Sequence, residues 1–226
     1  MKMLKNGFVA ALILAFLMAF TAVANADEWT TSRMRLNIWG NGSTVVGGSF
    51  TPALQTSDVV GSGPSFAISW QYNPFHSLGF EIGYQLSWMD FEKEFRTEEG
   101  KTPAFVVHQI TLAGKYNFGD LISPDARIRP FISAGIGLYP FRFTEDGLGG
   151  DTQVLPNGNK FEKTSFGLNT GAGIEIRALN RLSIIGGVRY HYLFAKDDDK
   201  FGADSGFKNQ GLLNYGIGLS YHLPIH

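Results

Sequence analysis

The segment Leu78-Gly79-Phe80-Glu81-Ile82-Gly83-Tyr84-Gln85-Leu86-Ser87-Trp88 alternates strictly between two kinds of residue. Its even-numbered positions are bulky and largely apolar, whereas its odd-numbered positions are glycine or polar. Only the pleat of a β-strand, with its period of two, places these sets on opposite faces. The closing segment repeats the pattern, with Leu213, Tyr215, Ile217, Leu219, Tyr221 and Leu223 opposed to Leu212, Asn214, Gly216, Gly218, Ser220 and His222.

Strands of this kind recur along the chain, and the connections between them alternate in length. The further strands are expected at residues 33–39, 66–72, 105–118, 128–141, 165–176 and 182–194. Short connections at 73–77, 119–126 and 177–181 alternate with long ones at 41–65, 90–104, 142–164 and 195–208. Transmembrane barrels have short periplasmic turns and long outer loops. The sequence therefore predicts an all-β fold, an eight-stranded antiparallel up-and-down transmembrane β-barrel with both termini in the periplasm.

The N-terminus has the features of a secretory signal. Lys2 and Lys5 precede an apolar run at 8–20, and Ala24-Asn25-Ala26 offers the small residues that signal peptidase accepts. At about 1.5 Å per residue, this run is too short for a hydrocarbon core of roughly 30 Å. We predict a signal peptide at 1–26, removed after Ala26, and one barrel domain at 27–226. The expected location is the bacterial outer membrane, because a closed sheet can also satisfy every backbone group in lipid.

Composition narrows the partners and the chemistry. Nineteen basic residues face 20 acidic ones, and removal of Lys2 and Lys5 makes the mature chain more acidic. This balance argues against nucleic acid as a partner. The absence of cysteine excludes disulfides, thiolate metal sites, cysteine catalysis and a lipid-modified N-terminal cysteine.

The contents of the two strand faces bear on the surroundings of the barrel. One face collects many glycines and also Glu81, Lys115, Arg129, Glu175 and Arg189, which suits a cramped polar interior. The other face is nearly free of charge, and its aromatics gather toward two rims: Trp70, Tyr72, Tyr116, Phe118 and Tyr221 at one, and Trp88, Tyr190, Tyr192 and Phe194 at the other. Two aromatic girdles are typical of bilayer proteins. They favour a membrane barrel over a soluble lipocalin-like barrel, which keeps its apolar face inside.

Glycine-rich strand motifs carry a resemblance to a known family. They are Arg129-Pro130-Phe131, Ala134-Gly135-Ile136-Gly137-Leu138-Tyr139, Gly171-Ala172-Gly173-Ile174-Glu175, Gly187-Val188-Arg189-Tyr190 and Tyr215-Gly216-Ile217-Gly218-Leu219-Ser220-Tyr221-His222-Leu223. Over essentially the whole mature chain, the sequence resembles the small outer-membrane β-barrel proteins of the OmpA transmembrane-domain, OmpW and OmpX types. The resemblance implies contact with outer-membrane lipid and lipopolysaccharide, and an assembly signal for the barrel-assembly machinery at Gly218, Tyr221 and Leu223. Members usually end on an aromatic residue, whereas Pro224-Ile225-His226 follows here.

The histidines do not predict an enzyme. Some barrels similar to this one act on lipid A with a serine and a histidine near the outer rim, and such chemistry needs a hydroxyl, an imidazole and an orienting acid. His108 is the only histidine that the alternation places on the lipid side, and Ile110, not a serine, stands two residues away. His191 is expected to point inward beside Arg189, and His222 to lie at the opposite end of the barrel. We therefore predict no catalytic residue.

The acidic run Asp197-Asp198-Asp199 in the last outer loop is the one candidate for a cation site. Clustered carboxylates supply the oxygen ligands that divalent cations prefer. The run lacks the fixed spacing and the glycine of a calcium loop, which favours a solvated acidic tip. We predict neither a metal site nor a cofactor.

The strand order also predicts the depth of the inward charges. Because successive strands run in opposite directions, Glu81 follows a periplasmic turn, Lys115 precedes one, Arg129 follows it and Glu175 precedes the next. These four residues should lie at similar depth on neighbouring strands, so that acid meets base between Glu81 and Lys115 and between Arg129 and Glu175. Arg35 of the first strand should approach from across the lumen. Eight strands leave a lumen just wide enough for side chains. We predict that this charge cluster plugs the periplasmic half of the barrel, with Arg189 and His191 in the upper lumen.

Two functions fit this sequence best, and a lipid A-modifying enzyme is a third, less favoured alternative. The first is a structural or interaction protein that displays long loops at the cell surface. The alternative is a narrow pore, or an OmpW-like channel, for small solutes. The filling of the lumen distinguishes them, since paired inward charges would close it. The sequence names no ligand, receptor or solute.

Overall fold

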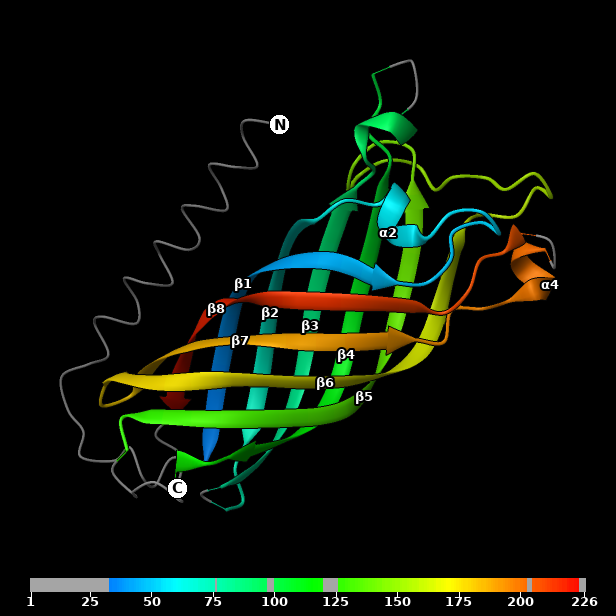
Figure 1. Ribbon diagram of the computed structural model, residues 1–226. Coiled ribbons are helices and arrows are strands. Elements are labelled where there is room, and N and C mark those ends of the chain that lie inside the picture. The colour runs from blue at the N-terminus through cyan, green and yellow to red at the C-terminus, as the bar shows by residue number, and fades with distance from the viewer. Residues whose placement is uncertain (1–32, 76, 97–99, 120–125, 203–204, 224–226) are drawn as a thin grey trace.

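The computed structural model describes residues 33–75, 77–96, 100–119, 126–202 and 205–223. Its eight strands form a closed antiparallel barrel in which each strand pairs with its chain neighbours and β8 pairs with β1 (Figure 1). The strands are β1 (Met34–Gly47), β2 (Gly63–Tyr72), β3 (Leu78–Asp90), β4 (Ala104–Asn117), β5 (Ile128–Thr144), β6 (Glu162–Leu179), β7 (Leu182–Leu193) and β8 (Gln210–Leu223). The predicted fold class is confirmed. The predicted signal peptide, His76 and residues 224–226 lie outside the described residues.

The long connections gather at one end of the barrel. They contain short helical segments, α2 (Thr56–Val59), η1 (Lys93–Phe95) and α4 (Asp198–Phe201). Figure 1 shows α2 and α4 at the end opposite the short turn between β6 and β7. By the usual arrangement of such barrels, the end with the long loops faces the cell exterior. In the part of the chain that the structure describes, no helix is both long enough and apolar enough to span a membrane.

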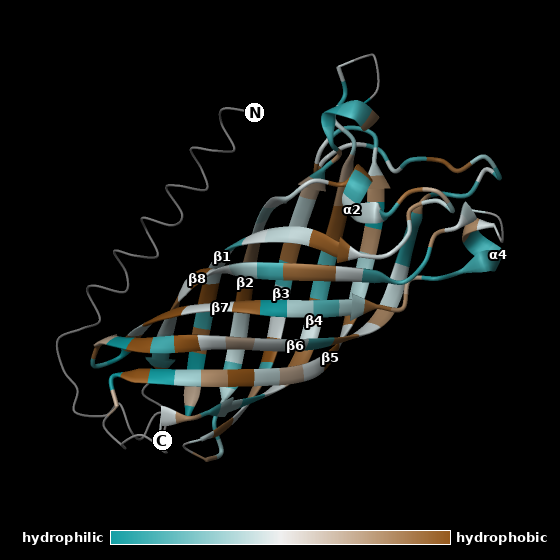
Figure 2. Cartoon of the chain, in the orientation of Figure 1, coloured by the Kyte–Doolittle hydropathy of each residue, from teal (hydrophilic) through white to brown (hydrophobic). Residues whose placement is uncertain are grey.

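Alternation along the strands separates a lipid face from a lumen face. In β3, Ile82 keeps 58% of its surface exposed on the outside, whereas Glu81, its neighbour in the chain, keeps 2%. The predicted girdle residues Trp70, Tyr72, Tyr190 and Tyr192 are likewise exposed large side chains. Figure 2 shows the resulting alternation of hydrophobic and hydrophilic bands along the strands. The apolar face therefore points outward, as the membrane interpretation requires.

Several strands extend further toward the outer end than the sequence predicts. The first strand continues to Gly47 rather than ending at residue 39, and β5 and β6 reach Thr144 and Glu162. The polar residues Asn41-Gly42-Ser43 look like a loop, but Ser43 pairs with Gly63 of β2 and with Asn214 of β8. These extended ladders form a sheet that continues into the outer loops.

Glycines in the lumen accommodate aromatic rings from neighbouring strands. A side chain at Gly218 would meet the carbonyl of Ile38 and, at 3.1 Å, the indole of Trp39. A side chain at Gly173 would meet the ring of Phe131 at 2.6 Å. Trp39 and Phe131 lie opposite these glycines in the strand register. The glycine-rich face therefore makes room for inward aromatic side chains, in addition to charged ones.

We expect the folded protein to be heat-modifiable, because a closed sheet has no free edge from which detergent can unzip it. Unboiled samples should migrate differently from boiled samples in a denaturing gel, and circular dichroism should show strand as the dominant signal. Identical migration before and after boiling would contradict the closed barrel.

Candidate functional site

The charged residues predicted for the periplasmic half all lie inside the barrel. Arg35, Glu81, Lys115, Arg129 and Glu175 each keep less than one-twentieth of their surface exposed. The strand register places Gln71 opposite both Arg35 and Glu81, and Arg129 opposite Glu175. Together with Arg189 and His222, which contact two of them, these residues form what we call the ionic layer.

Glu175 is the centre of one buried group in this layer. Its Oε2 accepts a hydrogen bond from Nη1 of Arg35 at 2.7 Å, which joins β6 to β1 across the lumen. Its Oε1 lies 3.2 Å from Nε2 of His222. Arg35 thus approaches Glu175 from across the lumen. The sequence analysis did not include His222 in the charge cluster, although the alternation places it inward and the strand order places it at the periplasmic end.

Glu81 is the centre of a second buried group, and its partner differs from the expected one. Nη2 of Arg189 donates to Oε1 of Glu81 at 2.7 Å, so Arg189 reaches down from β7 to β3. Lys115, the neighbour that strand adjacency indicated, donates instead to Oε1 of Gln71 at 3.2 Å and lies 4.0 Å from the centre of the Phe131 ring. The order of neighbouring strands cannot reveal an ion pair that forms across the lumen.

Arg129 lies at the edge of the ionic layer nearest the periplasmic turn. It stands opposite Glu175 in the β5–β6 ladder, and its Nε donates to the carbonyl of Ala126 at 3.4 Å. A side chain at Gly119 would clash with the Arg129 methylenes, the nearest at 2.5 Å. The arginine therefore lies against Gly119 and Ala126, which flank the connection between β4 and β5.

Ser183, His222 and Glu175 meet in a way that resembles a hydrolytic triad in composition only. The Ser183 hydroxyl lies 3.2 Å from Nε2 of His222, and Glu175 approaches the same nitrogen. In a triad the acid holds one ring nitrogen while the other accepts the serine proton. Here both partners share Nε2, and all three side chains are buried at the periplasmic end of the lumen. This geometry holds residues in place and offers no nucleophile to a substrate.

A second polar layer lies nearer the outer end and consists of neutral groups. We call it the amide layer; its members are Ser43, Gln85, Ser87, Gln109 and Asn214. Ser43 donates to Asn214 at 2.6 Å, Asn214 donates to Gln109 at 2.9 Å, and Gln109 donates to Ser87 at 2.9 Å. Ser87 lies 2.9 Å from Ser43, which closes the ring across the lumen.

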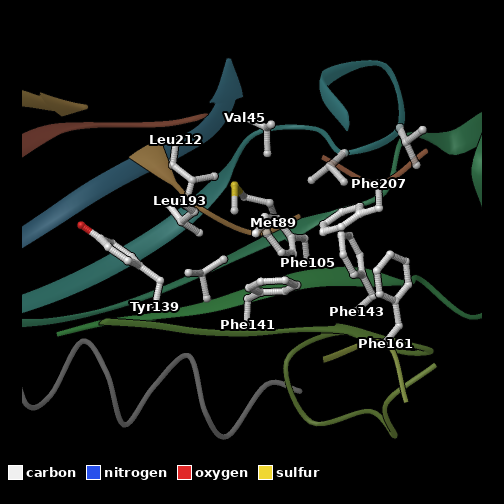
Figure 3. Packing of buried hydrophobic residues seen from close by; sticks show 14 of the residues in the cluster. Val45, Met89, Phe105, Tyr139, Phe141, Phe143, Phe161, Leu193, Phe207 and Leu212 are labelled. Atoms are coloured by element: carbon white, nitrogen blue, oxygen red, sulfur yellow. The ribbon is translucent and has the colours of Figure 1, made fainter. Parts of the chain in front are cut away.

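The outermost part of the lumen is apolar, which corrects the expectation of a polar interior throughout. Figure 3 shows aromatic side chains packed together where β4 and β5 approach the loops. The aromatic plug, as we call it, contains Val45, Val59, Val60, Met89, Phe91, Phe105, Val107, Tyr139, Phe141, Phe143, Phe161, Leu193, Ala195, Phe201, Phe207 and Leu212. Phe105 and Phe143 stack with their ring centres 4.5 Å apart. These apolar side chains are buried against one another at the outer end of the barrel.

The long loops supply part of this plug. The ring centre of Phe143 lies 4.2 Å from that of Phe161, in the loop after β5, and 5.9 Å from that of Phe207, in the loop after β7. Phe50, from the loop after β1, packs against Phe143 at 5.3 Å. Three loops that are distant in sequence are therefore joined over the mouth of the barrel.

A small cavity of about 50 Å³ lies in the lumen between the ionic and amide layers. Glu81 and Arg189 line it together with Ser69, Gln109 and His191. His191 is buried, and its Nδ1 lies 3.0 Å from the Tyr139 hydroxyl. We call this space the polar chamber, after the charged and amide side chains that line it.

Two remaining candidates form local contacts. His108 faces outward, and its Nδ1 lies 2.8 Å from the hydroxyl of Tyr84. In the loop after β7, Asp197 accepts from the backbone N–H of Lys200 and pairs with Lys163 at 3.2 Å. These two partners, the backbone N–H first, hold the pKa of Asp197 below its usual value. Within the described ranges, no three His, Asp or Glu residues are grouped so as to hold a metal ion.

The predicted assembly residues lie at the end of β8. Tyr221 stands opposite Leu36 of β1 and Leu182 of β7, and Leu223 stands opposite Met34. Gly218 packs against Trp39, as described above. Their recognition by the assembly machinery stays a prediction.

Comparisons with known proteins agree with this architecture. A family model described as "Outer membrane protein beta-barrel domain" matches residues 11–222. The fold is similar to that of Neisserial surface protein A, with a TM-score of 0.58, 16% identity, and coverage of 85% of this chain and 98% of that one. It is also similar to the outer membrane protein AlkL, with a TM-score of 0.53, 13% identity, and coverage of 90% and 96%. A search of curated proteins finds no match. At these identities the structural likeness concerns the fold alone.

We expect Glu175→Gln to destabilise the barrel by about 3–5 kcal/mol, because it leaves Arg35 buried without its counter-charge. Equilibrium unfolding in urea should measure the loss. The matched control is Glu145→Gln, which removes an ion pair with Lys101 whose side chains are 46% and 43% exposed. That change should cost less than about 1 kcal/mol. Equal stability of the two variants would contradict the account of the ionic layer.

Proposed function

Because the chain belongs to the outer membrane protein β-barrel domain family, we propose that it is a structural barrel of the bacterial outer membrane whose outer loops form an interaction surface and whose lumen does not conduct solutes. The loops in question lie at 48–62, 91–103, 145–161 and 194–209. Family membership supports the location and the contact with outer-membrane lipid. The proposed role of the outer loops as an interaction surface goes beyond family membership and rests on the filling of the lumen.

The observation that carries the proposal is that the lumen is filled at both of its ends, by different physical means. At the periplasmic end, Glu175 and Glu81 draw Arg35 and Arg189 across the lumen, each with a contact of 2.7 Å. At the outer end, the aromatic plug replaces water with packed rings. A solute would have to break buried ion pairs and also displace an apolar core, and both steps are unfavourable.

The joining of the loops supports an interaction role. Phe50, Phe161 and Phe207 pack three of the loops against the barrel, so the described parts of these loops form one outer surface. A preorganised surface loses less conformational entropy when it binds a partner. The similar fold of a protein named as a surface protein, Neisserial surface protein A, is consistent with this role.

A narrow pore is the second candidate, and the polar chamber is the observation that favours it. The chamber of about 50 Å³ is lined by Glu81, Arg189 and His191 and lies between the ionic layer and the aromatic plug. If both of these opened, the chamber would become the middle of a pore. For a pore, the ionic layer and the aromatic plug would act as gates in series.

A lipid-modifying enzyme is a weaker candidate. Among the described residues, outward-facing His108 has a tyrosine as its hydrogen-bond partner, and Ser183 and His222 are buried inside the barrel. We propose no catalytic role, and the assembly residues Gly218, Tyr221 and Leu223 are proposed to serve insertion of the barrel.

The closed lumen predicts no steady conductance for the wild-type protein in planar bilayers. Neither Glu175→Gln nor Phe143→Ala alone should open a pore, because the other closure remains in each variant. The double variant weakens both ends of the lumen and should show brief openings, because only the neutral amide layer and the Glu81–Arg189 pair then remain across it. Ile217→Ala, on the lipid face, is the control and should stay silent. Steady wild-type conductance would refute the proposed function and favour the pore.

A further inference from the structure

A recess of about 460 Å³ opens at the outer end of the barrel. It lies between the loop that joins β1 to β2 and the loop that joins β7 to β8. The lining residues are Gly48, Ser49, Gln55, Tyr192, Lys196, Lys208 and Asn209. Neither the ionic layer nor the aromatic plug includes any of these residues, so the recess is a separate feature of the surface.

The recess carries two ammonium groups that are available to a ligand. Lys196 lies 3.0 Å from Asp198, but their side chains are 57% and 49% exposed. Such a solvated pair contributes little, and an incoming anion can replace it. Lys208 is exposed as well, and none of the ion pairs found among the described residues includes it. The lining contains no carboxylate, so its charge is positive.

Hydrogen bonds fix the backbone from which the two lysines project. The Asn209 side chain accepts from the backbone N–H of Lys196 at 3.1 Å and donates to the Tyr192 hydroxyl at 3.1 Å. The backbone N–H of Lys208 donates to the carbonyl of Ser49 at 3.1 Å. These bonds join both loops and strand β7 around the recess.

The position of Tyr192 places the recess at the membrane surface. Tyr192 faces outward near the outer end of β7, and its ring packs edge-on against Phe194 at 5.3 Å. Exposed aromatic residues at this position mark the level of the lipid headgroups. A ligand in the recess would therefore lie beside the outer leaflet, where the phosphates of its glycolipids are located.

We propose that Lys196 and Lys208 bind a phosphate group of an outer-leaflet glycolipid headgroup, with Tyr192 packing against the sugar or acyl chain beside it. Lysine is a point charge with rotatable donors and suits a phosphate that approaches from several directions. This site goes beyond the proposed function and requires only that the long loops face the exterior. It is independent of whether the lumen conducts.

The test is a titration of the refolded full chain in detergent micelles with bisphosphorylated lipid A, followed by thermophoresis. Each of Lys196→Gln and Lys208→Gln should weaken binding about fivefold, from about 1 kcal/mol per basic residue near an anionic lipid surface. The double variant should bind about 25-fold more weakly if the two contributions add. Lipid A from which both phosphates have been removed should bind the wild-type protein at least as weakly as intact lipid A binds the double variant.

The matched control is Lys160→Gln, an exposed lysine in the loop after β5 that does not line the recess. It should bind lipid A as the wild type does. Wild-type affinity in the double variant would overturn the proposal, as would an equal loss in Lys160→Gln. Displacement of lipid A by inorganic phosphate at similar concentration would also overturn it, because the recess would then recognise a free anion.

Discussion

Closure of the sheet after eight strands is the constraint on which the rest of this structure depends. It removes the free edges of the sheet and leaves a lumen about as wide as the side chains that point into it. Every second residue of every strand must therefore share the same narrow space. The identity of those residues decides whether the barrel is filled, hydrated or open.

The chain meets this constraint with different chemistry at different depths. Buried carboxylates pair with arginines from distant strands near the periplasmic end, as Glu81 does with Arg189. Nearer the outer end, neutral amides and hydroxyls such as Gln109 and Ser87 form a ring of hydrogen bonds across the lumen. Aromatic side chains fill the outer end, where the loops add further rings. Glycines such as Gly173 leave space where an inward ring crosses a neighbouring strand.

The sequence predicts the barrel well because alternation is a local property. In β3 each residue reveals its own face, and the order of strands then places Glu81, Lys115 and Glu175 at related depths. The aromatic plug could not be predicted in this way. In Ala104-Phe105-Val106-Val107 both strand faces are apolar, so the sequence shows no alternation there. The plug's partners in the loops, such as Phe161, have no strand pattern at all.

Contacts across the lumen also exceed what strand order can predict. Adjacency indicated Lys115 as the partner of Glu81, but Arg189 on β7 has the longer side chain and reaches the carboxylate from the far wall. The recess at Lys196 and Lys208 was not predicted for a similar reason. It exists because Asn209 and Ser49 bring two loops together, and their separation in sequence hides the contact.

The central claim is that the middle of the lumen is sealed from both sides, and thiol accessibility tests it most directly. The chain has no cysteine, so Ser69→Cys would place a single thiol at the polar chamber, and Asn157→Cys would place one on an exposed loop. A charged thiol reagent should be applied to both sides of vesicles that contain the folded protein. The account predicts rapid modification of Asn157→Cys and modification of Ser69→Cys only after denaturation. Modification of Ser69→Cys in the folded protein at the rate of Asn157→Cys would contradict the sealed lumen.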